Sequence, residues 1–205
     1  MGERTHVLES VSDDGATLAQ QPEHFKNDRE VVAAAVKNYG HALSYASDEL
    51  KKDREIVLGA VSQNGVALKH ASEEMRNNRK IVMAAVNQKG TALAFASEAL
   101  KDDEEVVMAA VVRHGEALKH ASERLRDSYE VVEAAVRNDW GSLRFASARA
   151  KEDEALGAIA EERSAGALSN ADSDVSSDVG VDNKNKAKQK QRKAHGKQGI
   201  SPNQE

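Results

Sequence analysis

The hydrophobic residues of the chain follow a pattern that returns every 25 residues. Glycine and leucine each recur at this interval, with polar residues between the apolar ones. The glycines stand at Gly15, Gly40, Gly65, Gly90 and Gly115, and the leucines at Leu18, Leu43, Leu68, Leu93, Leu118 and Leu143. A constant period of this length is typical of repeat arrays, in which each unit buries its apolar face against its neighbours.

The pattern inside one unit predicts two short helices. In the unit at residues 28–52, Asp28 is a residue type that caps the start of a helix, and the apolar residues of 31–36 share one helical face. Gly40 is expected to end this helix in a left-handed conformation, and a second helix is expected to follow. Ser47, which recurs in the other copies, is either an interior residue of that second helix or the cap of a separate turn. A break or bend at the serine is favoured.

Helix pairs this short need neighbours to bury their apolar faces. The sequence therefore predicts an all-α fold, an α-solenoid of about six 25-residue helix-pair repeats with a disordered C-terminal tail. The solenoid is predicted over residues 3–163, and the tail over residues 164–205, which are acidic first, then basic, and too polar to form a core. The repeats are expected near residues 3–27, 28–52, 53–77, 78–102, 103–127 and 128–152, with a partial copy at 153–163.

The charge of the chain is unevenly distributed. The formal net charge is −5, and residues 164–205 contribute +2 from seven Lys/Arg and five Asp/Glu, so the predicted solenoid carries −7. An acidic folded part is unlike nucleic-acid-binding domains, which present a basic face. The chain contains no cysteine, which excludes disulfides and thiolate metal sites, and no apolar stretch is long enough to span a membrane. We therefore expect an intracellular, cytoplasmic protein, with the nucleus as an alternative location.

One copy of the unit, residues 53–77, reads D-R-E-I-V-L-G-A-V-S-Q-N-G-V-A-L-K-H-A-S-E-E-M-R-N. It resembles the repeat called domain of unknown function 4116 and is more distantly similar to leucine-rich variant repeats. The resemblance extends over about residues 3–155, because the same signature recurs at constant period. It implies an all-helical repeat in intracellular proteins of microbial eukaryotes, and it implies no activity, cofactor or iron–sulfur centre.

The histidines and carboxylates do not form a recognisable catalytic or metal site. His70 and His120 occupy the same position in copies two repeats apart, so stacking would separate them by roughly 20 Å, too far to share a metal ion. Carboxylates such as Glu30 and serines such as Ser47 recur from copy to copy, and helix starts favour both. The sequence therefore predicts no catalytic residue, no metal, no cofactor and no enzymatic activity.

Two charged rows follow the repeat along the stack. The basic row is Lys26, Lys51, Arg76, Lys101, Arg126 and Lys151, and the acidic row is Asp48, Glu73, Glu98 and Glu123. The favoured interpretation is a solvated face on which the two rows neutralise each other. The alternative is that one row docks an extended partner, as the long surfaces of solenoids allow.

The positions that differ most between the copies are 37–39 and 41 with their equivalents, around the glycine turn. Scaffold residues repeat, whereas recognition residues would differ, so this edge is the predicted binding surface. The candidate partner-binding residues are Tyr39, His41, Lys89, Arg113, His114 and Trp140. Trp140 stands in the place of the recurring glycine, and it is either a plug at the end of the stack, which is favoured, or an exposed anchor.

The main functional hypothesis is a monomeric, non-enzymatic repeat scaffold that binds a protein or peptide partner. The alternative is a nucleic-acid-associated or nuclear-targeted protein that acts through the basic tail. The candidate targeting or phosphate-contact residues of that tail are Lys184, Lys186, Lys188, Lys190, Arg192, Lys193 and Lys197. No aromatic residue lies between them, so any contact with nucleic acid would be weak, nonspecific and sensitive to salt.

Overall fold

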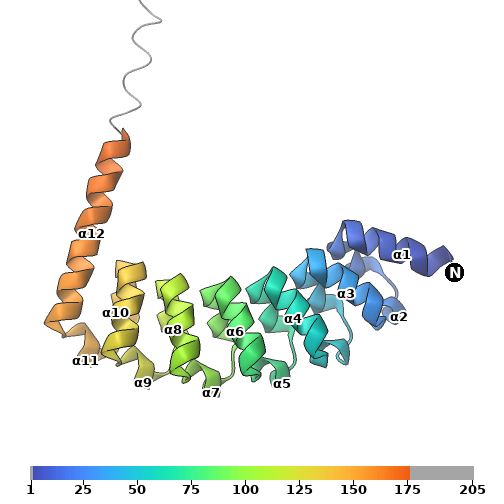
Figure 1. The fold of residues 1–205 in the computed structure, drawn as a ribbon, viewed down its shortest axis with the longest axis horizontal. Helices are drawn as coiled ribbons and strands as arrows, with labels where there is room; N and C mark the ends of the chain where they lie inside the picture. Colours follow the sequence, from blue (N-terminus) through green and yellow to red (C-terminus); the bar gives the residue numbers. More distant parts are fainter. Residues whose placement is uncertain (1, 176–205) are drawn as a thin grey trace, which may run out of the picture. The chain divides into compact units, whose positions relative to one another are not determined.

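The computed structural model describes residues 2–175, and every regular element in that range is helical (Figure 1). The chain divides into two units after Arg163, and the first unit is the repeat array. Long α-helices lie side by side along this array, so the predicted all-α solenoid is confirmed. The seven basic candidates of the predicted tail, between residues 184 and 197, lie outside the described residues.

Each repeat begins with a long α-helix. In the second repeat Asp28 caps this helix, because its side chain accepts hydrogen bonds from the N–H groups of Glu30 and Val31 at 3.0 and 3.2 Å. The long helices are α1 (Gly2–Asp13), α3 (Arg29–Asn38), α4 (Arg54–Gln63), α6 (Arg79–Gln88), α8 (Glu104–Arg113) and α10 (Tyr129–Asn138). Consecutive members of this series contact each other, so they form one layer of the array.

The second helix of each predicted pair is in two pieces. The first piece is a 3-10 helix, and these are η1 (Gly15–Gln20), η2 (Gly40–Tyr45), η4 (Gly65–His70), η5 (Gly90–Phe95), η6 (Gly115–His120) and η7 (Trp140–Phe145). The second piece is one helical turn, and these are α2 (Glu23–Lys26), η3 (Leu50–Lys52), α5 (Glu73–Arg76), α7 (Glu98–Lys101), α9 (Glu123–Arg126) and α11 (Ala148–Lys151). Neighbouring 3-10 helices contact each other, so they form a second layer.

The recurring serine separates these two pieces, as the favoured interpretation of the sequence holds. Ser72 has an extended backbone, and its hydroxyl oxygen accepts from the N–H of Met75 at 3.4 Å to cap α5. Its own N–H donates to the carbonyl of Lys51 in the preceding repeat at 3.0 Å. The equivalent serines do the same, so this residue both breaks the helix and ties each repeat to the one before it.

The glycine recurs for a different structural reason from the predicted one. Tyr39, with a φ of −135°, ends α3, and Gly40 begins η2. None of the glycines between residues 2 and 166 has a positive φ, so the predicted left-handed cap is wrong. A Cβ atom on Gly65 would lie 2.3 Å from the carbonyl oxygen of Ala85 in the next long helix. The glycine is therefore required because the following repeat packs directly against it.

The hydrophobic core lies between the layer of long helices and the layer of 3-10 helices. Valine, isoleucine, alanine and leucine fill it at the repeated positions, for example Val31, Val32 and Ala35 from α3 and Leu43 from η2. Small and β-branched residues dominate because successive helices approach each other closely. The core is therefore a continuous thin strip that each repeat extends.

Regular stacking changes at the last repeat. Trp140 takes the place of the glycine and is 49% exposed, so it does not plug the core. In the other copies, a Cβ atom added to the glycine would lie 2.3 to 2.5 Å from a carbonyl oxygen of the next long helix. Because Trp140 has a Cβ atom, the next helix, α12 (Glu154–Val175), cannot approach with the regular spacing. Asp153 still caps α12 through the N–H groups of Ala155 and Leu156. The helix runs past residue 163, where the repeat pattern ends.

Candidate partner-binding groove

The outer surface of the long helices carries shallow grooves between neighbours. A small residue stands at the middle of each long helix from α3 to α10 on this surface: Ala34, Gly59, Ala84, Ala109 and Ala134. Two such grooves are well formed, one between α1 and α3 with a volume of about 540 Å³ and one between α6 and α8 with about 660 Å³. The grooves are a consequence of the repeat, and their character depends on the residues that line them.

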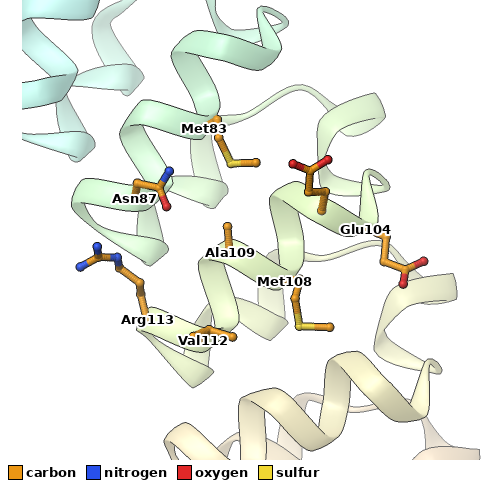
Figure 2. Close-up of a pocket in the computed structure, with 8 residues that line it drawn as sticks. Met83, Asn87, Glu104, Met108, Ala109, Val112 and Arg113 are labelled. Carbon is orange, nitrogen blue, oxygen red and sulfur yellow. The ribbon is translucent and has the colours of Figure 1, made fainter.

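The α6–α8 groove has an apolar floor (Figure 2). Residues of α8 spaced by four positions fall on one helical face and line it from one side. The lining residues are Met83 and Asn87 from α6, and Glu104, Glu105, Met108, Ala109, Val112 and Arg113 from α8. Val112 is 57% exposed, and Met83 and Met108 are partly buried. The groove therefore presents an apolar surface to solvent.

Opposite charges stand at the two ends of this groove. Glu104 lies at the start of α8 and Arg113 at its end, and Figure 2 shows them on opposite sides of the apolar floor. Neither side chain makes a hydrogen bond or an ion pair within residues 2–166. Glu105, in contrast, is paired with Arg79. The groove thus has an acidic end and a basic end whose charges are available.

Among the described residues, the Arg113 side chain is unpaired because it does not make the contact between repeats that its equivalents make. At the equivalent position of other repeats, an amide side chain clamps two repeats together; we call this the clamp position. Gln63 there accepts from the N–H of Gly40 at 2.7 Å and donates to the carbonyl of Asn38 at 2.9 Å. The residues at the clamp position are Asn38, Gln63, Gln88, Arg113 and Asn138. An arginine has only donors and cannot accept the glycine N–H.

His114 takes over the clamp in this repeat. Its Nδ1 accepts from the N–H of Gly90 at 3.1 Å. His114, a sequence candidate for partner binding, therefore has a structural partner already. Arg113, also a candidate, lines the groove instead.

Two further candidates, Tyr39 and His41, belong to a cluster of rings on the 3-10 layer. Their ring centroids are 5.8 Å apart, and His41 lies 5.6 Å from His70. Burial lowers the pKa of His41, and the nearby Lys69 lowers it further. Burial likewise lowers the pKa of His70. His41 Nδ1 is buried without a hydrogen-bond partner, so the cluster is an apolar packing contact.

The last two candidates, Lys89 and Trp140, are exposed but do not line the groove. The structure therefore does not gather the six sequence candidates in one place. Sequence reasoning missed Met83, Glu104 and Met108, and it noted the position of Val112 as variable without selecting Val112. The signal was present, because the copies also differ at these positions: Met108 corresponds to Ala33 and Glu133, and Val112 to Lys37 and Arg137.

The predicted basic and acidic rows are partly paired with each other. Lys51 and Lys101 bind Asp48 and Glu98 of the acidic row at 3.3 and 2.8 Å. Lys26 binds Glu23, three residues earlier and outside that row, at 2.9 Å. This agrees with a solvated face on which the rows neutralise each other. Within the described part of the chain, no group of three or more His, Cys, Asp or Glu side chains is placed to hold a metal ion.

The fold defines an α-helical repeat protein of the solenoid class. The family model for the domain of unknown function DUF4116 matches residues 7–51, 53–101 and 103–149, and the chain belongs to this family. Each matched segment spans two structural repeats, so the family unit is a pair of them. No curated protein and no solved structure matches the chain. In residues 2–175, no helix is long and apolar enough to cross a bilayer.

Proposed function

We propose that this chain is a non-enzymatic repeat scaffold that binds a protein or peptide partner through the α6–α8 groove. The observation that carries the proposal is the exposed apolar floor of the groove, formed at positions where the copies differ. Covering apolar surface is favourable by roughly 25 cal/mol per Å². A partner that covers Met108 and Val112 would gain this free energy.

The residues that recur in every copy have tasks within the scaffold. The serine ties repeats together, the glycine admits the next helix, and the clamp position satisfies the glycine N–H. Met108 and Val112 have no such task, because α10 carries Glu133 and Arg137 at the same positions and forms the same helix. Apolar side chains that the scaffold does not need support an external role.

The preference for a scaffold over an enzyme also rests on the structural roles of the recurring residues. Carboxylates such as Asp28 and Asp103 cap helices and pair with arginines, and the serines cap turns. These groups are used in the architecture, which favours binding over catalysis.

A site-specific photocrosslinker tests the proposal. Benzoylphenylalanine replaces Val112 in one sample and Lys37, the equivalent residue of the α1–α3 groove, in another. We expect a partner protein to be captured from the native source through position 112 and not through position 37. The captured partner is then purified, and its affinity for the full chain is measured.

The affinity measurement uses a substitution that the chain already tolerates. Met108→Glu with Val112→Arg copies the Glu133–Arg137 pair of α10, whose side chains meet at 2.8 Å, onto α8. We expect at least about a tenfold loss of affinity, because a charged pair replaces the apolar floor. Ala33→Glu with Lys37→Arg places the same pair on α3 and should leave affinity unchanged. Equal affinity of both variants would overturn the proposal.

The tail-based alternative is separated by deletion of residues 176–205. If the α6–α8 groove carries function, the crosslinked partner binds the truncated chain as tightly as the full chain. If the basic tail carries function, binding disappears and falls steeply with salt in the full chain.

A further inference from the structure

The α6–α8 groove also indicates what kind of partner it takes, an inference that rests on the proposed function. We propose that the occupant is an amphipathic α-helix lying antiparallel to α8, with acidic residues in its first turn at Arg113 and basic residues in its last turn at Glu104.

The lining of the groove favours a helix over an extended chain. An extended peptide must find partners for its backbone N–H and C=O groups, whereas a helix satisfies them internally. The floor is formed by the side chains of Met83, Met108, Ala109 and Val112, and Asn87 is the single neutral polar residue of the lining. Such a surface contacts side chains and offers little to a bare backbone.

The dimensions of the groove agree with a short helix. The groove lies between two ten-residue helices, α6 and α8. Ten residues of α-helix extend about 15 Å, or roughly three turns. A partner helix of this length presents apolar residues at positions i, i+3 or i+4, and i+7 along one face. Methionine side chains at Met83 and Met108 adapt to the shapes of such residues.

The acidic end of the groove departs from the pattern of the other repeats. Arg4, Arg29, Arg54 and Arg79 hold the position that Glu104 holds in α8. Three of these arginines pair with acids of the following repeat, for example Arg79 with Asp103 at 2.9 Å. The following repeat offers Glu104 no cation there, because it has Ser128 and Glu130 at those positions. The scaffold therefore gives this charge no partner.

The basic end departs from the pattern in the same repeat. Arg113 replaces the clamp amide, and His114 restores the lost hydrogen bond. Glu104 and Arg113 both differ from the residues that bind neighbouring repeats in other copies. Both lie in α8, at the two ends of one apolar groove (Figure 2). This coincidence supports an external partner with complementary charges.

The direction of the partner follows from the charges that helices usually carry. Acidic residues are favoured in the first turn of a helix and basic residues in the last, because they oppose the helix dipole. A helix antiparallel to α8 places its first turn near Arg113 and its last turn near Glu104. A parallel helix would bring like charges together at both ends.

A displayed peptide library tests this inference without knowledge of the natural partner. The library contains helical peptides of about 14 residues, four turns, with fixed apolar residues on one face and all other positions randomised. It is selected on the full chain, with counter-selection on the Met108→Glu, Val112→Arg variant. We expect enriched peptides to carry Asp or Glu in the first turn and Lys or Arg in the last.

Charge substitutions then check the orientation of a selected peptide. Arg113→Gln, which copies Gln88, and Glu104→Arg, which copies Arg79, should each weaken binding about two- to fivefold. A peptide with its terminal charges exchanged should prefer the Glu104→Arg, Arg113→Glu double variant. Lys37→Gln in the α1–α3 groove is the matched control and should have no effect.

Other results overturn the inference. They are an empty selection, enriched peptides of the opposite polarity, and selected sequences that bind without helical structure. If any of these occurs while the partner crosslinked at position 112 still requires Met108 and Val112, only the helical occupant is refuted. Loss of that requirement refutes the proposed function itself.

Discussion

The α1–α3 and α6–α8 grooves are built in the same way and present different surfaces. Both lie between consecutive long helices above a small residue, Ala34 in one and Ala109 in the other. Both have an acidic residue at the same place, Glu30 and Glu105. On the second helix of each groove they differ at four equivalent positions, where Arg29, Ala33, Lys37 and Asn38 correspond to Glu104, Met108, Val112 and Arg113. On the first helix, Leu8 and Ser12 of α1 correspond to Met83 and Asn87 of α6.

The comparison separates what the repeat determines from what a single repeat adds. The scaffold fixes the spacing of the helices through the glycine, the serine and the clamp position, so a groove follows wherever two repeats meet. The residues that differ do not change the helices, yet they convert a polar groove into an apolar one with charged ends. Under the proposed function, stability and recognition are carried by different positions of the same 25-residue unit.

The largest effect is expected from breaking the spacing that both grooves share. A Cβ on Gly90 would lie 2.3 Å from the carbonyl oxygen of Ala110, and one on Gly15 the same distance from that of Ala35. Gly90→Ala and Gly15→Ala should each lower the free energy of unfolding by roughly 3 kcal/mol, because backbone has to move. Urea denaturation followed by circular dichroism measures this.

Gly59→Ala is the control for this prediction. Gly59 lies inside α4, its added Cβ would be 3.7 Å from the nearest atom of Val36, and the other long helices from α3 to α10 have alanine there. We expect stabilisation by about 0.5–1 kcal/mol, since alanine favours helices. Equal losses at positions 59 and 90 would contradict the account of the glycine.

The next largest effect concerns the clamp, which differs between the two grooves. In the α1–α3 groove, Asn38 Oδ1 accepts a hydrogen bond from the N–H of Gly15 at 2.9 Å. In the α6–α8 groove, His114 Nδ1 accepts from the N–H of Gly90 at 3.1 Å. His114→Lys, which copies Lys89, leaves the glycine N–H without an acceptor and should cost about 2 kcal/mol. Adding Arg113→Gln restores the amide clamp and should recover most of that loss. A failure of this rescue would show that His114 acts in some other way.

Much of the fold could be predicted from the sequence because the same physical requirement recurs in every copy. The period, the Asp28-type caps and the buried valines all follow from local chemistry repeated at one interval. The division of the second helix at Ser72 was foreseeable for the same reason. The role of the recurring glycine could not be predicted in this way. Gly65, for example, packs against Ala85 of the next repeat, and no local rule describes a contact between repeats.

The groove was harder to predict than the fold. The comparison of copies drew attention to the glycine turn, where Tyr39 and His114 vary. Some of that variation is structural, because the clamp can be made by an amide or by a histidine one residue later. The variation on which the proposed groove rests lies at Met108 and Val112, whose exposure depends on how α6 and α8 pack. Variation alone does not distinguish a recognition residue from an alternative solution to one packing problem.

A smaller effect is expected when the apolar lining is transplanted. Ala33→Met with Lys37→Val gives α3 the two apolar residues of α8. Stability should change by no more than about 0.5 kcal/mol, because these positions lie on the surface. In the Met108→Glu, Val112→Arg background, the transplant should restore part of the binding of a library-selected helical peptide, measured by fluorescence anisotropy. No restored binding would mean that the charged ends, and not the floor, dominate.

The smallest effect concerns a feature that both grooves keep, the arginine that reaches the cap of the next helix. Arg4 binds Asp28 at 2.8 Å, and Arg79 binds Asp103 at 2.9 Å. The hydrogen bond from the arginine is the main cause that holds the pKa of each aspartate below its ordinary value. An aspartate with a lowered pKa stabilises the fold fully above its unfolded pKa, about 3.9, and this contribution is lost as the pH falls through the folded pKa.

Arg4→Ala and Arg79→Ala should therefore cause equal, small decreases of the urea midpoint at pH 7. Both differences from the parent chain should shrink as the pH falls below about 3.9, where protonation removes the partner charge. Arg54→Ala is the control, because Arg54 faces Asn78 and Lys80 in the following repeat and has no ion pair within residues 2–166. A difference that grows in acid, or a loss at Arg54 as large as at Arg79, would contradict a role for these arginines at the caps. Equal behaviour at Arg4 and Arg79 would show that this cap contact does not distinguish the two grooves.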